Sequence, residues 1–137
     1  MAYTTIDDPS AYFQALLYTG NGSNPRNLTN TGNSDLKGDW IWTKNITDAS
    51  TNHITCNSSL GFDAPKGQAG GTNGDSCNKN AKEFIAYQWK CNGGTTSSNT
   101  DGNITSTVQV NSTAGFSIGM YEGSGSGSAT VGHGLGS

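Results

Sequence analysis

FQALLYTGNGS at residues 13–23 returns as FSIGMYEGSGS at residues 116–126, aligned without a gap. Five of the eleven positions are identical, against roughly one expected by chance at this composition. The identical pairs are Phe13/Phe116, Tyr18/Tyr121, Gly20/Gly123, Gly22/Gly125 and Ser23/Ser126. Only the first copy runs on into a second apolar segment, residues 39–44, so the second copy lacks a follow-on strand. A strand without a neighbour is open to pairing with another chain.

The composition favours strands and turns over helices. Gly, Ser, Thr and Asn make up about half of the 137 residues, whereas charged residues are 12% and hydrophobic residues 31%. Gly, Asn and Ser punctuate turns, while Thr, Val, Ile and the aromatic residues favour strands. We therefore predict an all-β fold, an antiparallel β-sandwich of jelly-roll type with long polar loops. An extended N-terminal arm, residues 1–10, precedes the sandwich domain, residues 11–137.

Alternating apolar residues indicate where the strands lie. The predicted strands are residues 12–18, 40–44, 53–59, 84–91, 104–110, 116–120 and a short last one at 129–133. The strongest is 84–91, and we expect its Ile85, Tyr87, Trp89 and Cys91 to face the core. Residues 61–80 and 92–102 are rich in Gly and Asn and are predicted as loops. A single helical turn fits within residues 76–84.

Charge and hydropathy exclude two classes of partner. The net charge of −3 gives no basic patch for nucleic acid, and no segment approaches the roughly 18 apolar residues of a membrane span. The opening residues show neither a basic nor an apolar leader region. We expect either release by another route, such as cell lysis, or a leader outside this sequence.

Three cysteines, Cys56, Cys77 and Cys91, cannot all pair within one chain. Outside a reducing cytosol we expect one intrachain disulfide, joining Cys77 to Cys56 or to Cys91, and one buried or intermolecular thiol. The sequence contains no CxxC, and His53 three residues before Cys56 has no partners at finger-like spacing. We therefore expect no metal and no cofactor.

Asn-x-Ser/Thr sequons mark candidate sites for covalent glycans. They lie at Asn21, Asn27, Asn45, Asn57, Asn103 and Asn111. Six is a mild excess over the roughly three or four expected by chance in a chain so rich in Asn, Ser and Thr. Several fall in predicted loops or at strand ends, where a glycan fits and would solubilise a surface that carries few charges.

A catalytic site is not indicated. Asp7 and Asp8 are adjacent, so in an extended arm they point to opposite faces and cannot flank one glycosidic bond. Single acids occur at Glu83 and Glu122, and single histidines at His53 and His133. Neither histidine has a Ser or Cys motif of nucleophile-elbow type beside it. We expect a protein that is not an enzyme.

Several blocks together resemble a family of phage-associated structural proteins. They include YTTIDDPSAYFQ at residues 3–14, DWIWTKN at 39–45, GFSI at 115–118 and ATVGHGLG at 129–136. The resemblance implies a β-rich structural or receptor-facing module at an extracellular or virion surface, and it brings no catalytic motif. This chain departs from the family by ending after ATVGHGLG and by a shortened loop between Cys56 and Cys77.

The missing follow-on strand and the resemblance together predict a fibre subunit. We expect the last strand, with Ala129, Thr130 and Val131, to lie at an open sheet edge. The N-terminal arm of a neighbouring copy, with Thr4, Thr5 and Ile6, would complete that edge. Such a head-to-tail contact generates an open filament. The alternative is that both termini pair within their own sandwich and leave a monomer.

The alternative hypothesis is that the protein is a carbohydrate-binding or receptor-binding module that acts as a monomer or small oligomer. Trp40, Trp42 and Trp89, with Tyr87 and Tyr121, can stack on sugar rings if they line an exposed face. A thin core needs the same aromatic residues, so their exposure decides between the fibre hypothesis and the binding-module hypothesis.

Overall fold

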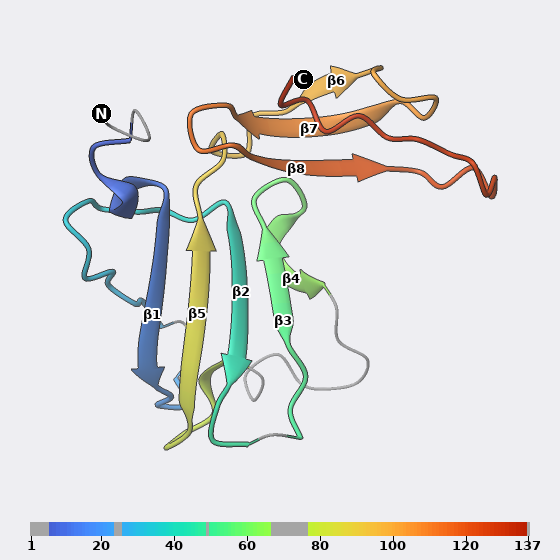
Figure 1. The fold of residues 1–137 in the computed structure, drawn as a ribbon. Helices are drawn as coiled ribbons and strands as arrows, with labels where there is room; N and C mark the ends of the chain where they lie inside the picture. Colours follow the sequence, from blue (N-terminus) through green and yellow to red (C-terminus); the bar gives the residue numbers. More distant parts are fainter. Residues whose placement is uncertain (1–5, 24–25, 49, 67–76, 137) are drawn as a thin grey trace.

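The computed structural model describes residues 6–23, 26–48, 50–66 and 77–136. Its elements are one short 3-10 helix, η1, and eight strands (Figure 1). In chain order they are η1 (Pro9–Ala11), β1 (Phe13–Thr19), β2 (Trp40–Asn45), β3 (Ile54–Asn57), β4 (Gly61–Lys66), β5 (Glu83–Trp89), β6 (Ser97–Asn99), β7 (Ser106–Asn111) and β8 (Phe116–Tyr121). The predicted all-β class is confirmed.

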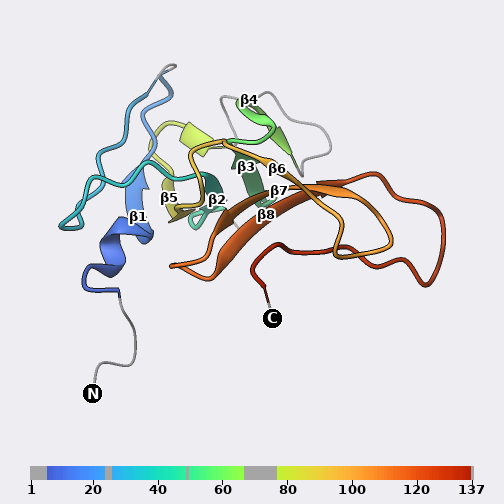
Figure 2. The same cartoon turned by 90° about the horizontal axis from the view of Figure 1, so that it is seen from above.

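The strands form two antiparallel sheets. The first has the order β1-β5-β2-β3-β4, and the second has the order β6-β7-β8. The second sheet lies across one end of the first (Figures 1 and 2). Two antiparallel sheets are consistent with a β-sandwich. The jelly-roll topology is not confirmed, because the first five strands stay in one sheet and the last three in the other.

Both copies of the internal repeat form edge strands. Among the described residues, β1 pairs with β5 alone, and β8 pairs with β7 alone. The follow-on segment of the first copy, β2, is not a neighbour of β1, because β5 lies between them. Gly22 and Gly125, which align in the repeat, have φ of +71° and +73°. Glycine adopts this left-handed conformation without steric cost, so the two copies share a backbone conformation at this position as well as a strand.

The buried face of the first sheet is the opposite of the one we expected. Along β5 the buried residues are Phe84, Ala86 and Gln88, whereas Ile85, Tyr87 and Trp89 are only half-buried. The expectation that those three face the core is therefore wrong. Cys91, beyond the strand end, is buried as predicted.

The loop of residues 26–38 covers that buried face (Figure 2). Asn30 and Gln88 exchange side-chain hydrogen bonds at 2.6 and 3.3 Å. On β1, the Gln14 amide donates to the carbonyl of Ser34 at 2.8 Å. Because these amides have partners, Gln14 and Gln88 can be buried on this face, whereas Nδ2 of Asn45 on β2 is buried there without a hydrogen-bond partner.

Polar side chains form a large part of the interior. The buried apolar residues are Leu36, Ile54, Phe84, Ala86, Cys91 and Val108. The buried polar or charged residues are Gln14, Asp39, Thr43, Asn45, Gln88, Ser106 and Gln109. Among the described residues the polar set is thus as large as the apolar one, and hydrogen bonds carry much of the specificity of the fold.

Asp39 stands at the centre of the junction between the two sheets. Its carboxylate accepts a hydrogen bond from the hydroxyl of Ser58 at 2.7 Å. It also accepts hydrogen bonds from the backbone N–H groups of Cys91 and Gly93 at 2.7 and 3.0 Å. Burial raises the pKa of Asp39, but these hydrogen bonds and the nearby Lys90 outweigh it, and the net pKa lies below its ordinary value.

Gln109 on β7 continues this network from the second sheet. Its amide nitrogen donates to the hydroxyl of Ser58 at 2.9 Å, and its oxygen accepts the N–H of Gly94 at 2.9 Å. The side chain is fully buried. Ser58 therefore connects Asp39 of the first sheet to Gln109 of the second.

Candidate functional site

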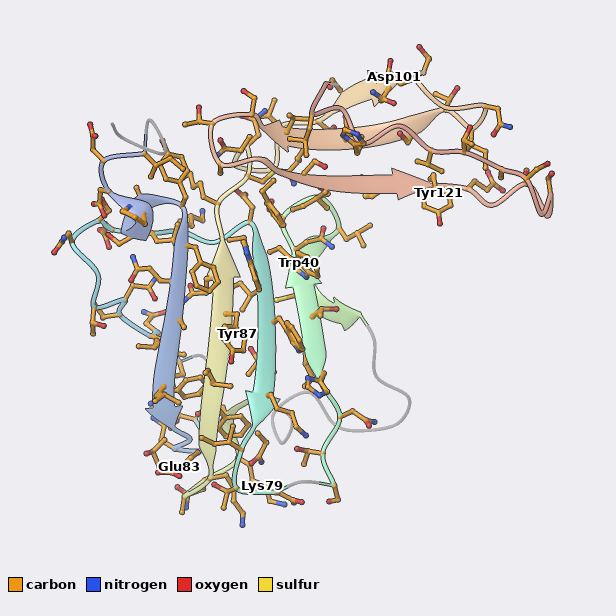
Figure 3. All side chains as sticks on the ribbon, in the orientation of Figure 1. Trp40, Lys79, Glu83, Tyr87, Asp101 and Tyr121 are labelled. Carbon is orange, nitrogen blue, oxygen red and sulfur yellow. The ribbon has the colours of Figure 1, made fainter. Side chains whose placement is uncertain are left out.

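The uncovered face of the first sheet carries a cluster of aromatic rings. Residues directly opposite on neighbouring strands share a face, and Phe13, Trp89 and Trp40 lie opposite one another across β1, β5 and β2. Two residues further along, Tyr87 lies opposite Trp42. We call these five residues the aromatic face. Figure 3 shows Tyr87 about midway along β5 and Trp40 at the end nearest the second sheet.

The rings of the aromatic face touch one another in an unbroken array. Trp89 lies between Phe13 and Trp40, with ring centroids 5.0 and 5.4 Å away. Tyr87 lies between Trp42 and Phe13, with centroids 5.7 and 6.4 Å away. These separations are in the range of favourable aromatic contacts. Each ring is held by its neighbours as well as by its strand.

The second sheet covers only one end of the aromatic face. Phe116 of β8 stacks on Trp40 and Trp89 with centroid distances of 5.8 and 6.1 Å. Away from that contact Trp42 is 37% exposed and Phe13 is 41% exposed. From the sequence it was open whether Trp40, Trp42, Tyr87 and Trp89 belong to the core or to the surface. In the structure Trp40, Tyr87 and Trp89 are half-buried and Trp42 is exposed.

His53 fixes the orientation of the outermost indole. The Trp42 Nε1–H donates to Nδ1 of His53 at 2.8 Å, and the two ring centroids are 5.3 Å apart. An accepting Nδ1 requires the neutral imidazole with its proton on Nε2. Sequence reasoning missed this pairing, because His53 belongs to a polar run of Thr and Asn residues with no pattern that points to Trp42.

β1 presents an open edge next to the aromatic face. Tyr12 and Gly20, at its two ends, bond through the backbone to Lys90 and Lys82 beside β5. By the alternation of an antiparallel ladder, the backbone groups of Phe13, Ala15 and Leu17 then point outward. Within the described part of the chain these outward groups have no backbone partner.

Nothing in the β1 sequence protects this edge. Phe-Gln-Ala-Leu-Leu-Tyr-Thr has no charge and no proline, and its register with β5 runs without a bulge. Natural edge strands commonly carry a charged residue, a proline or a β-bulge, which prevents pairing with other chains. Leu17, on the outward set, is 67% exposed. We call this strand the β1 edge.

The predicted acceptor at the C-terminal end is already occupied by the chain itself. Val131 forms one parallel bridge with Ile104, and the N–H of Ile104 donates to the carbonyl of Thr130 at 3.0 Å. The N–H of Thr130 donates to Asn103 Oδ1 at 2.8 Å. Residues 129–131 therefore do not form the expected open edge strand.

The N-terminal arm is tied down at Asp8. Its Oδ1 accepts the N–H of Ser10 at 2.9 Å, and its Oδ2 accepts the hydroxyl of Ser34 at 2.6 Å. Hydrogen bonds from the Ser10 and Ser34 side chains lower the pKa of Asp8. Residues 8–10, which we expected to belong to the arm, are thus bound to the domain. Thr4 and Thr5 lie outside the described residues, and Ile6 is half-buried.

The three cysteines are free thiols, so the expected disulfide is not formed in this structure. Cys56 and Cys77 are half-buried and Cys91 is buried. Burial raises the pKa of all three and brings that of Cys77 to about 11. Cys91 lies beside β8, where its thiol approaches the carbonyl of Phe116 at 3.7 Å.

The candidate glycosylation sites differ in accessibility. Asn21, Asn27 and Asn103 are exposed, Asn57 and Asn111 are half-buried, and Asn45 is buried. The Oδ1 of Asn45 accepts the backbone N–H groups of Thr47 and Asp48 at 3.0 and 2.9 Å. A glycan on Asn45 is incompatible with this packing, whereas one on the exposed asparagines is not.

The described part of the chain offers neither a cluster of metal ligands nor a membrane-spanning helix. It holds no group of three or more His, Cys, Asp or Glu side chains that would suit a metal ion. None of its helices has the length and apolar character to span a membrane.

Residues 46–137 match the sequence model of a family described as a domain of unknown function, DUF7483. The chain belongs to this family. A search of curated proteins found no match, and neither did a search of solved structures. The DUF7483 region contributes Tyr87 and Trp89 to the aromatic face, together with Phe116 that stacks on one end of it. Phe13, Trp40 and Trp42 precede this region. Both candidate features therefore depend on the segment in front of the DUF7483 region.

Proposed function

We propose that this protein is a structural subunit of an extracellular or virion-associated fibre, and that its copies join by strand addition at the β1 edge. The observation that carries the proposal is a seven-residue edge strand with no charge, proline or bulge. A strand of this kind is a template for another chain. The resemblance to phage-associated structural proteins points the same way.

The side chains of the edge support burial in an assembly. Phe13 and Leu17 are 41% and 67% exposed, and both side chains lie on the aromatic face side of the sheet. A pairing strand would satisfy the outward backbone groups and cover part of this apolar surface at the same time. A monomer leaves both exposed, at a cost in solubility.

The donor we favour is the N-terminal arm of a neighbouring copy. Residues 1–7 precede the anchor at Asp8 and include Thr4, Thr5 and Ile6. An arm of one copy on the β1 edge of the next is a heterologous contact, which gives a head-to-tail filament when the rotation does not close a ring. Glycans on the exposed Asn21, Asn27 or Asn103 would solubilise a fibre of such low charge.

Negative-stain microscopy and light scattering of the purified chain test the proposal. The wild type should form filaments of uniform width. Leu17→Lys places a charge on the β1 edge and should abolish them, whereas Leu60→Lys, at another exposed leucine in the β3–β4 turn, should not. Circular dichroism should show the same fold in both variants. A wild type that stays monomeric at high concentration, or filaments that persist in Leu17→Lys, would overturn the proposal.

A further inference from the structure

We propose that the aromatic face is a binding site for a neutral carbohydrate chain. The inference stands on the ring array alone and does not require that the protein form a fibre. The part left open by Phe116 consists of Trp42, Tyr87 and Phe13, whose centroids follow one another at 5.7 and 6.4 Å. Three rings in a row can contact successive units of one chain.

The chemistry of the rings suits the apolar faces of sugars. An aromatic face carries partial negative charge, so it attracts the C–H groups that cover one side of a pyranose ring. Binding sites for small ligands combine such apolar platforms with a few polar groups that fix orientation. In the single chain Trp42 and Phe13 are each more than a third exposed, so these rings are accessible there without any rearrangement.

The surroundings of the rings favour an uncharged ligand. Across the sheet, Thr55 lies opposite Trp42 and Asn57 lies opposite Trp40. Ala15, Thr55 and Asn57, the direct cross-strand neighbours of the rings, carry no charge, and the first charged residue of either row is Lys66 on β4, opposite Thr55. The hydroxyl and amide groups next to the rings match the hydroxyl groups of a sugar, and no charged residue of these rows lies directly beside a ring.

The hydrogen bond that Trp42 donates to His53 prepares Trp42 for this role. The indole Nε1–H is fixed at 2.8 Å from Nδ1 of His53, so the ring plane is held before any ligand arrives. A side chain held in its bound orientation loses less conformational entropy on binding. His53 is thus a positioning residue and Trp42 the residue that contacts the sugar.

Titration of the full-length chain with neutral hexasaccharides tests the site. The probes are cellohexaose, maltohexaose and mannohexaose, followed by isothermal calorimetry and by tryptophan fluorescence. At least one should bind saturably. Trp42→Ala and Phe13→Ala should each weaken that affinity about tenfold or more, as expected for a central contact residue. Tyr121→Ala is the matched control, because Tyr121 is a 61% exposed aromatic residue on the second sheet, away from the aromatic face (Figure 3).

Three results would overturn the inference. The first is that none of the three probes binds saturably. The second is that Trp42→Ala and Phe13→Ala bind the probe as tightly as the wild type. The third is that Tyr121→Ala loses as much affinity as they do. His53→Ala should weaken binding less than Trp42→Ala and broaden the indole Nε1–H signal in the NMR spectrum. Failure of the chain to form filaments leaves these outcomes unchanged, so the two proposals fail separately.

Discussion

The carboxylate of Asp39 accepts the backbone N–H of Cys91 at 2.7 Å. Asp39 immediately precedes β2, and Cys91 follows the end of β5 on the way to the second sheet. The bond therefore holds the chain at the point where it leaves one sheet for the other. Through Ser58, the same carboxylate is linked to Gln109 on β7.

Replacing Asp39 with asparagine should destabilise the protein by about 2 kcal/mol, because buried hydrogen bonds to a charged group are worth about 1.5–3 kcal/mol. The new amide group also places donors against the N–H groups of Cys91 and Gly93. Urea denaturation followed by tryptophan fluorescence measures the change. Asp35→Asn, at an exposed acid in the loop 26–38, should leave the midpoint unchanged. Equal effects of the two substitutions would contradict this role for Asp39.

Acid should weaken the same junction. The pKa of Asp39 is lowered in the folded protein from its ordinary 3.8, so the unfolded chain binds the proton more readily. Its contribution to stability is fully present above about pH 5, and it is lost as the pH falls through 3.8 toward the folded pKa. Urea midpoints from pH 7 to pH 3 should therefore fall less steeply in Asp39→Asn than in the wild type. Parallel curves for the two proteins would rule out this linkage.

Gly20 and Gly123 align in the repeat but should respond differently to alanine. A Cβ on Gly20 would lie 2.0 Å from the backbone carbonyl oxygen of Lys79, whereas one on Gly123 meets nothing within 4 Å. Overpacking against backbone costs about 1–3 kcal/mol. Thermal unfolding should show a clear loss of stability for Gly20→Ala and almost none for Gly123→Ala. The prediction fails if the two variants melt together.

The thiols should react slowly while the protein is folded. With the pKa of Cys77 raised by burial from 9.0 to about 11, its thiolate fraction at pH 8 falls on the order of one hundredfold. Ellman's reagent should label Cys77 slowly in the native state and all three cysteines at once in urea. Prompt labelling of the native protein would contradict the burial. A single reactive thiol in urea without reductant would reveal a disulfide between the other two.

If copies join by the proposed strand addition, shortening the N-terminal arm should prevent filaments without unfolding the domain. The deletion removes residues 2–5 and ends before Asp8, because Asp8 is bound to Ser34 of the domain. The truncated chain should keep its circular dichroism spectrum and elute as a monomer. Filaments that still form after the deletion would show that another segment fills the β1 edge.

The sequence predicts the positions of most strands but not their faces. The expected strand 84–91 appears as Glu83–Trp89, and 12–18 appears as Phe13–Thr19. Alternation shows that a strand has two faces, but which one is buried depends on where the loop 26–38 packs. β4 and β6 arise within predicted loops, because pairing to β3 and β7 compensates for weak local propensity.

The candidate site was only half visible in the sequence. Trp40 and Trp42 on one face follow from the period of a strand, and Tyr87 and Trp89 on β5 follow likewise. The open edge of β1 does not, because it requires knowing that β5 lies between β1 and β2. Nor does local pattern reveal that residues 129–131 bind Asn103 and Ile104 of their own chain.

The polar interior has a thermal consequence. Exposing apolar surface raises the heat capacity of unfolding, and exposing polar surface lowers it. Because Gln14, Gln88, Gln109 and their polar neighbours take up much of the buried space, the heat capacity increment per residue should fall below the usual range of about 12–15 cal/mol/K. The protein should accordingly have a shallow stability curve, in which the free energy of unfolding changes little with temperature.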